Sequence, residues 1–314
     1  MRCIFMGSPP FAMPVFEALL ESGHVVLALV TQPDKPRGRG REIVPSDLVL
    51  RAREAGIPVL QPESTKTPEF GQALREFEPD VLLVASYGEI LNTAVLELAP
   101  HGALNVHGSI LPRWRGAAPI QRAVAAGDKL TGVSVQRMVL ALDAGDIQLE
   151  RVIPIEGTDT SGSLFDKLAV LGGEAAVEAL CELDQKRASY TPQDAQAATH
   201  APKLRKPEGQ VDWNLTAVHL ERHVRAMSPW PGAQAATPDR KPLIIEQARL
   251  VPDLSGEPGT LLETSPRLVV ACAQGALELV TVKPAGKRAM EAGAWLRGAR
   301  LEVGARLFGG TEAK

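Results

Sequence analysis

Asp80-Val81-Leu82-Leu83-Val84-Ala85 is the stretch that decides the fold class of this chain. Its run of consecutive apolar residues suits a strand covered on both faces, because a half-exposed strand would alternate apolar with polar residues. Working outward, apolar runs at Arg2–Met6, Val25–Thr31 and Ala103–His107 predict further strands, and periodic segments between them predict helices. Strands that alternate with helices indicate βαβ units, so we expect an α/β domain built on a parallel sheet.

The second part of the chain has a different pattern. Ala188–Pro207 is rich in Ala, Pro, Gln and Thr with little periodicity, which is typical of a linker. Beyond a predicted helix at Thr216–Met227, short extended runs broken by Gly and Pro predict a small β-barrel or sandwich. A length of 314 residues suits two domains. We place the first at 1–189, a linker at 190–205 and the β-barrel domain at 206–314.

The composition excludes several classes of protein. With 45% hydrophobic and 23% charged residues the chain is globular rather than disordered. No stretch approaches the ~20 apolar residues that cross a bilayer, and Met1–Gly7 is too short for a signal peptide. We therefore expect a soluble cytoplasmic monomer without membrane contact. Cys3, Cys181 and Cys272 lack the spacing of a disulfide framework or a metal site, so we expect three buried thiols and no metal.

The two parts of the chain carry net charges of opposite sign. Residues 1–200 hold 18 Lys and Arg against 25 Asp and Glu, a net charge of −7. Residues 201–314 hold 16 against 12, a net charge of +4. A basic C-terminal part is compatible with a polyanionic partner, although ordinary scatter of surface charge explains it equally well.

A basic loop follows the second predicted strand. Thr31–Glu42 contains Lys35, Arg37, Arg39 and Arg41 together with two glycines and two prolines, so we expect neither a regular helix nor a strand. Arginine makes forked, charge-assisted contacts to phosphate oxygens. We favour a loop that contacts phosphates over a solvated surface excursion.

Polar residues cluster around the end of the Ala103–His107 strand. The alternation of side chains places Asn105 and His107 on one side of it, and open α/β sheets bind their ligands at the carboxyl ends of strands. A histidine at a strand end is by itself more often structural. Here Leu111–Ile120, with the sequence LPRWRGAAPI, follows directly and is unusually rich in Arg, Trp, Gly and Pro for a mere connector. Asp143, in a turn flanked by glycine, can face the same edge.

The motifs that follow are spread over nearly the whole chain. They are Thr31–Asp34 with the basic loop, Ser86–Gly88, Asn105–Gln121, Gly127–Asp128 with Thr131–Gly132, Leu142–Asp146, Asp159–Gly162, Val211–Trp213, Pro229–Pro231 and Lys283–Lys287. In these motifs the sequence resembles the methionyl-tRNA formyltransferase family. Other folate-dependent formyltransferases share the Asn-x-His motif and the Asp. The basic loop and the C-terminal motifs are what narrow the resemblance to the family that acts on tRNA. Two departures are mild: Ser8 stands where Thr is common, and Ile110 where Leu is common.

The resemblance implies a fold and an activity. The fold is a Rossmann-like formyltransferase domain followed by an OB-like β-barrel domain that binds tRNA. The activity is transfer of the formyl group of 10-formyltetrahydrofolate to the α-amino group of methionine on initiator Met-tRNA, for translation initiation. Asn105 would stabilise the oxyanion, His107 would exchange a proton, and Asp143 would orient His107 or accept the amine proton itself. No metal is needed.

The resemblance also implies binding residues. The folate contacts would be Ser109, Ile110, Leu111, Pro112, Tyr87 and Gly88, and the tRNA contacts would be Arg37, Arg39 and Arg41. Core packing is the alternative role for Ile110 and Leu111. The expected partners are tetrahydrofolate and initiator Met-tRNA.

Two other functions compete with this hypothesis. Another 10-formyltetrahydrofolate-dependent formyltransferase or hydrolase, acting on a small amine, a nucleotide sugar or water, would share Asn105, His107 and Asp143 but would not need the basic loop. A tRNA-binding or folate-binding protein without catalysis would not need all three of these residues.

Overall fold

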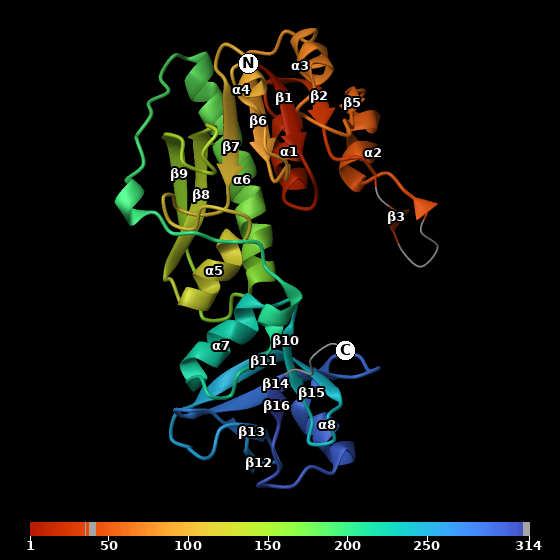
Figure 1. Cartoon of the computed structure of the whole chain (residues 1–314), viewed down its shortest axis with the longest axis vertical. Helices are drawn as coiled ribbons and strands as arrows, with labels where there is room; N and C mark the ends of the chain where they lie inside the picture. The colour runs from red at the N-terminus through yellow and green to blue at the C-terminus, as the bar shows by residue number, and fades with distance from the viewer. Residues whose placement is uncertain (35, 38–41, 310–314) are drawn as a thin grey trace. The chain divides into compact units, whose positions relative to one another are not determined.

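The structure, a computed structural model, describes residues 1–34, 36–37 and 42–309 (Figure 1). Its contacts divide the chain into two compact units. Unit 1 comprises 1–119, 130–154 and 165–201, and unit 2 comprises 120–129, 155–164 and the residues from 202 onward. The units differ from the expected consecutive domains, because two segments of the first half belong to unit 2. As limits of functional domains, residues 189 and 206 remain predictions.

Unit 1 is built on a seven-stranded sheet with the order β5-β2-β1-β6-β7-β8-β9. The strands are β1 (Arg2–Gly7), β2 (Val25–Val30), β5 (Val59–Leu60), β6 (Val81–Ala85), β7 (Ala103–His107), β8 (Leu130–Arg137) and β9 (Ile147–Pro154). All five residues of β6 are buried, which confirms the strand that decided the fold class. The pairs from β5 to β7 are parallel, whereas β8 and β9 pair antiparallel. The sheet is therefore mixed rather than wholly parallel.

Helices cover the sheet of unit 1 (Figure 1). They are α1 (Ala12–Glu21), α2 (Asp47–Glu54), α3 (Pro68–Arg75), α4 (Thr93–Leu96) and most of α6 (Ser161–Asp184). Adjacent glycines let α6 lie close to its neighbours. A Cβ at Gly172 would be 2.9 Å from Cγ1 of Val106 on β7, and one at Gly173 would be 2.9 Å from the Ala18 Cβ on α1. Strand β7, which carries the candidate site, is thus fixed against a long helix.

The basic loop contains a short pair of strands. β3 (Pro36–Arg37) pairs antiparallel with β4 (Glu42–Ile43), so the expectation that Thr31–Glu42 contains no strand is wrong for Pro36, Arg37 and Glu42. The backbone groups of these two short segments pair with each other, a contact that residue composition alone does not reveal. Arg39 and Arg41 lie outside the described residues, and Arg37 is described only by its backbone.

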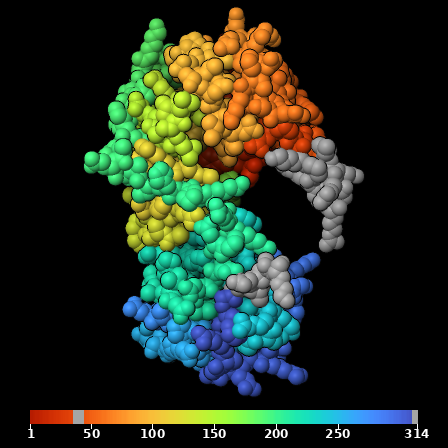
Figure 2. Space-filling model, in the orientation of Figure 1, coloured from red at the N-terminus to blue at the C-terminus, as the bar shows by residue number. Residues whose placement is uncertain are grey.

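The stretch expected to be a linker is bound to unit 1 over most of its length. We call residues 188–201 the strap, which lies on the surface and is shown in green in Figure 2. Thr191 exchanges backbone hydrogen bonds with Ile147, and Ala201 bonds to Arg115. The Arg137 guanidinium stacks 4.1 Å from the centre of the Tyr190 ring, just inside the strap. Low periodicity correctly indicated irregular backbone, but irregular backbone here is packed rather than free.

Unit 2 is dominated by an antiparallel sheet with the order β12-β13-β14-β11-β10-β16, and β15 pairs with β14. Its elements include most of α5 (Pro119–Ala126), α7 (Ala217–Ala226), β10 (Ala233–Ala236), β11 (Pro242–Val251), β12 (Leu261–Glu263), β13 (Leu268–Ala271), β14 (Ala276–Pro284), β15 (Met290–Glu291), α8 (Ala292–Ala299) and β16 (Phe308–Gly309). Leu261 donates to the Ala305 carbonyl and Leu307 to that of Gly259, so backbone bonds join the two ends of the sheet. The predicted small β-barrel is confirmed, and α8 was not predicted.

The cysteines differ in environment. Burial raises the pKa of both the Cys3 and the Cys272 thiol to about 12, as expected for buried thiols. Cys181 is only half-buried, with its Sγ 3.4 Å from Nε2 of His24, so the expectation of three buried thiols is wrong for this residue. Within the described ranges, no helix is long and apolar enough to cross a membrane. No group of three or more potential metal ligands occurs there either.

Candidate active site

The candidate site lies where β7 and β8 pair. Asn105 of β7 is opposite Gln136 of β8, and His107 is opposite Ser134. Side chains of directly opposed residues point to the same face of a sheet. Asn105 and His107 therefore share one face with Gln136 and Ser134, as the alternation along β7 predicted.

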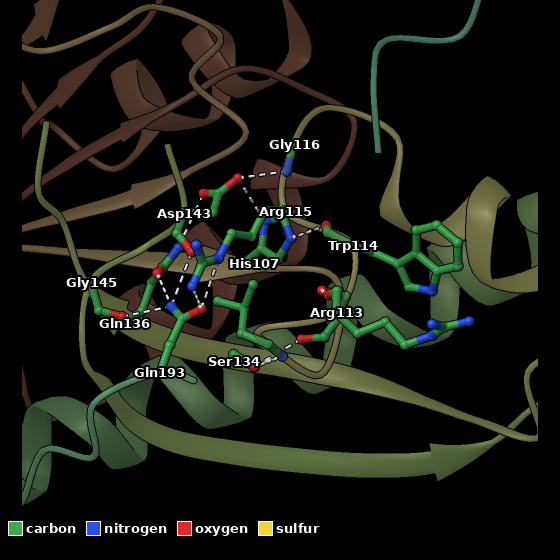
Figure 3. A network of polar contacts seen from close by, with 12 residues as sticks. His107, Arg113, Trp114, Arg115, Gly116, Ser134, Gln136, Asp143, Gly145 and Gln193 are labelled. Carbon is green, nitrogen blue, oxygen red and sulfur yellow. Dashed lines mark hydrogen bonds and ion pairs between the residues drawn. The ribbon is translucent and has the colours of Figure 1, made fainter. Parts of the chain in front are cut away.

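His107 is held between two oxygen atoms (Figure 3). It is 6% exposed, and its Nε2 lies 2.9 Å from the backbone carbonyl oxygen of Trp114. Because a carbonyl only accepts, this nitrogen carries a proton and donates it. The other ring nitrogen, Nδ1, is 3.7 Å from Oδ2 of Asp143. A proton on either nitrogen thus faces an acceptor.

Asp143 is aligned by two donors. Its Oδ2 accepts from the Gly116 backbone N–H at 2.8 Å, and its Oδ1 accepts from Nε2 of Gln136 at 3.0 Å. The backbone of Asp143 has φ +49°, in the left-handed region that Asp adopts more readily than most residues. The loop between β8 and β9 thereby turns the carboxylate toward His107, 36 residues earlier in the sequence.

The side-chain amide of Asn105 has no hydrogen-bond partner among the described residues. Asn105 is half-buried on β7. Its NH₂ group is therefore available as an uncharged donor, on the face that also carries His107.

The predicted folate contacts after β7 form a tight turn. Oγ of Ser109 donates to the Arg113 carbonyl at 2.7 Å, and the Ser109 carbonyl accepts from Oγ of Ser134 at 2.8 Å. The Leu111 N–H donates to the same Ser134 hydroxyl, and the Leu111 side chain is buried. Ile110 and Pro112 are half-buried.

Tyr87 and Gly88 follow β6 in a turn fixed by backbone contacts. The Tyr87 side chain lies in the core of unit 1, where burial and, secondarily, the Glu89 carboxylate raise the pKa of its hydroxyl. Within the described residues that hydroxyl has no hydrogen-bond partner. The Tyr87 carbonyl accepts from Nε2 of Gln32 at 3.1 Å, and Gly88 has φ +84°.

A cavity of about 140 Å³ adjoins Asp143. It is lined by Glu89–Leu91, Leu96 and most of Gln136–Gly145. Most of these residues are apolar, and the polar ones are Glu89, Gln136, Arg137 and Asp143. Ile90, Leu140 and Leu142 are exposed by 71%, 66% and 66%, so an apolar rim surrounds it. A mainly apolar cavity with a few polar groups is typical of a small-molecule site. None of the six predicted folate contacts lines it, and scattered apolar loop residues gave no signal from which to predict it.

Comparisons with known proteins show the family to which the chain belongs. Residues 1–180 match the family described as Formyl transferase, and residues 203–300 match Formyl transferase, C-terminal domain. The chain belongs to the formyl transferase family. The two matches together span most of its length and include Asn105, His107 and Asp143.

Three solved structures illustrate the fold that this chain shares with other proteins. HypX from Aquifex aeolicus, in complex with tetrahydrofolic acid, is 18% identical with a TM-score of 0.62, over 94% of this chain and 46% of its own. The sugar 3N-formyl transferase WlaRD is 14% identical with a TM-score of 0.67, and the match covers 91% of this chain and 98% of WlaRD. The N-formyltransferase from Helicobacter canadensis is 14% identical with a TM-score of 0.62, and the match covers 91% of this chain and 99% of that protein. The chain thus spans about half the length of HypX, and these identities show a shared fold alone.

Gly145 allows the turn that carries Asp143 to lie against β8. A Cβ at this position would overlap the carbonyl oxygen of Arg137. We expect Gly145→Ala to displace the turn, lowering the free energy of unfolding by about 1–3 kcal/mol. Because the displaced carboxylate no longer faces His107, formyl transfer should fall about tenfold.

The matched control for this substitution is Gly23→Ala, in the same unit. A Cβ at Gly23 meets nothing within 4 Å. Thermal unfolding and the formyl-transfer rate should both be unchanged in this variant. Equal behaviour of the two variants would show that the close approach of Gly145 does not position Asp143.

Proposed function

We propose that this formyl transferase moves the formyl group of 10-formyltetrahydrofolate to the α-amino group of methionine on initiator Met-tRNA. The observation that carries the chemistry is the cluster of Asn105, His107 and Asp143 beside the apolar cavity. An oxyanion donor, a proton-exchanging group and an orienting carboxylate are the parts that acyl transfer to an amine requires.

The reaction can be followed through these residues. The neutral amine attacks the formyl carbon, a C–N bond forms, and the carbonyl oxygen becomes an oxyanion to which the Asn105 amide donates. The bond between the formyl carbon and N10 of the folate then breaks. The amine loses one proton and N10 gains one, and the His107–Asp143 pair relays it as a unit. An α-amine with a pKa near 8 is partly neutral at physiological pH, so it needs less activation than a hydroxyl.

The donor site is supported by two observations. The cavity beside Asp143 has mainly apolar walls, against which the faces of a planar pterin ring can pack, and polar groups of Glu89, Gln136 and Asp143 that can meet the polar ring edges. HypX was solved with tetrahydrofolic acid, and the Helicobacter canadensis enzyme with folinic acid. In this proposal Ile90 and Leu142 join the predicted contacts Ser109–Pro112, Tyr87 and Gly88.

The acceptor assignment rests on charge. Residues from 201 onward carry a net charge of +4. Lys203 and Lys206, at the start of unit 2, are exposed and form no ion pair within the described residues. Together with the basic loop they favour a polyanionic acceptor. The alternative is a nucleotide-sugar acceptor, since WlaRD and the Helicobacter canadensis enzyme have a similar fold and nearly full coverage.

A side-by-side assay tests the acceptor. The protein and 10-formyltetrahydrofolate are incubated with initiator Met-tRNA, elongator Met-tRNA or a dTDP-amino sugar, and formylated product is measured for each. We expect kcat/KM for initiator Met-tRNA to exceed that for the amino sugar by at least ~10²-fold, because the tRNA presents many phosphates to the basic residues whereas the sugar nucleotide presents a single diphosphate. Preference for the sugar would overturn the tRNA assignment but retain formyl transfer. Release of formate with every acceptor would identify a hydrolase.

A further inference from the structure

Gln193, in the strap, reaches into the candidate site from a distant part of the chain (Figure 3). Its Nε2 carries two hydrogens and shares them among three oxygen atoms: Oε1 of Gln136 at 3.1 Å, the Asp143 carbonyl at 3.0 Å and the Gly145 carbonyl at 2.6 Å. Two of these acceptors belong to the turn that carries the Asp143 carboxylate. The third belongs to the side chain that donates to this carboxylate.

Arg115 fixes the other end of the same amide. Its Nε and Nη2 donate to Oε1 of Gln193 at 3.0 and 2.8 Å. The amide therefore has one possible orientation, since a flipped NH₂ would face the guanidinium and leave three carbonyl-type oxygens without a donor. A cation on the oxygen polarises the amide and strengthens the bonds that its NH₂ donates.

The same donor-to-acceptor direction continues from Gln193 to the Asp143 carboxylate. Gln136 accepts from Gln193 through Oε1, so its Nε2 is the atom that faces Oδ1 of Asp143 at 3.0 Å. Hydrogen bonds thus run in one direction from the Arg115 guanidinium through two amides to the Asp143 carboxylate. A network in which every member is satisfied holds its groups rigidly.

The strap also holds the opposite partner of His107. The Trp114 N–H donates to Oγ1 of Thr199 at 2.9 Å, and the Arg115 N–H donates to the Thr199 carbonyl at 2.8 Å. The Trp114 carbonyl is the acceptor for Nε2 of His107. One segment, through Gln193 and Thr199, therefore fixes both oxygens between which the imidazole lies.

We propose that Gln193 is a positioning residue for formyl transfer, which acts by holding the Asp143 turn and Gln136 so that the carboxylate faces His107. It touches none of the reacting groups itself. The proposal rests on the proposed function of the Asn105, His107 and Asp143 cluster.

The kinetic test uses Gln193→Ala and Gln193→Glu. The second variant keeps the size and the Arg115 contact but replaces the NH₂ donor with an oxygen that faces three other oxygens. We expect both to lower kcat about tenfold to fiftyfold, the usual scale for a supporting hydrogen-bond partner, with KM for donor and acceptor within twofold. Gln196→Ala, an exposed position in the same strap, is the matched control and should leave both constants unchanged. A kcat within twofold of the unsubstituted enzyme, or a loss confined to KM, overturns the proposal.

A double-mutant test separates positioning from general stability. In the Asp143→Asn background, Gln193→Ala should cost less than about twofold in single-turnover rate, because the carboxylate that it positions is gone. A cost equal to that in the unsubstituted enzyme would show that Gln193 acts elsewhere, and would contradict the proposal.

Hydrogen exchange on the free protein supplies a readout that needs no acceptor. In Gln193→Ala the peptide covering residues 139–146 and the Gly116 amide should exchange at least about tenfold faster, while Gln196→Ala matches the unsubstituted protein. If the unsubstituted protein formylates no Met-tRNA, the acceptor assignment fails, but this exchange comparison still tests Gln193. Unchanged exchange in Gln193→Ala would overturn the positioning role.

Discussion

We expect His107→Ala to lower kcat for formyl transfer at least ~10²-fold with saturating donor, and Asn105→Ala and Asp143→Ala to give losses of the same order. In the proposed mechanism, Asn105→Ala takes away the donor that faces the developing oxyanion. Replacing either member of the His107–Asp143 pair would break the proposed proton relay between the amine and N10. The measurement is the steady-state rate of formyl-methionyl-tRNA formation by each variant. Near-normal turnover of His107→Ala would rule out the relay.

The three losses should not multiply. All three residues act on one transition state, so the double variant His107→Ala with Asp143→Ala should be hardly slower than the slower single variant. His101→Ala is the matched control, an exposed histidine six positions before His107, and should retain full activity. Each variant should remain folded, since Asn105 and Asp143 are only partly buried. His107→Ala removes the hydrogen bond to the Trp114 carbonyl and should cost about 1–3 kcal/mol of stability.

The sequence predicted the parts of the fold that depend on local pattern. The uninterrupted apolar run of β6 and the two-residue alternation along β7 arise from burial and from strand geometry, which act over neighbouring residues. Strand β9 was not predicted, because its mixture of Gln, Glu, Arg and apolar residues shows no continuous apolar run. This mixture suits an edge strand that is exposed along part of its length. Because β9 was not predicted, its antiparallel pairing with β8 was not predicted either, since a hairpin cannot be inferred from one of its strands.

The candidate site was predictable only where chemistry and strand ends coincide. Asn105 and His107 satisfy both conditions, and Asp143 is marked by its glycine-flanked turn. Gln193 carries no such signal, because it lies 50 residues from Asp143 in a segment without periodicity. Its place is set by backbone bonds of the strap to the 112–118 loop, which join segments that are distant in the sequence. Composition alone predicts that the strap is a linker, because composition carries no information on hydrogen bonds between distant segments.

The second large effect concerns the basic loop. We expect the triple variant Arg37→Ala, Arg39→Ala, Arg41→Ala to formylate Met-tRNA with kcat/KM reduced about 10²-fold at physiological salt. Each exposed charge-assisted hydrogen bond to phosphate contributes about 1 kcal/mol, and about 1.4 kcal/mol corresponds to a factor of ten. The slope of log affinity against log salt should fall by roughly one unit for each phosphate that the variant no longer neutralises, so the variant should be less salt-sensitive.

The matched control removes the same charge elsewhere in unit 1. Arg53, Lys66 and Arg75 are exposed, and their replacement by Ala changes the net charge equally. This control separates phosphate binding by the loop from attraction by overall charge, because only specific binding makes the position of the charges matter. Equal losses of activity in the two triple variants would reduce the loop to a contributor of net charge.

Donor chemistry gives the sharper distinction between the acceptor hypotheses. In the proposed function, folate binding and the slow hydrolysis of 10-formyltetrahydrofolate depend on the cavity and on Asn105, His107 and Asp143. We therefore expect the loop variant to keep both within about twofold. Formylation of a small amine should be equally insensitive, since a small amine offers no phosphates for Arg to bind. If donor hydrolysis collapses with tRNA formylation, the loop belongs to the donor site. If formylation of Met-tRNA is unchanged, the preference for tRNA over a nucleotide sugar must come from unit 2, where Lys203 and Lys206 are then the next residues to neutralise.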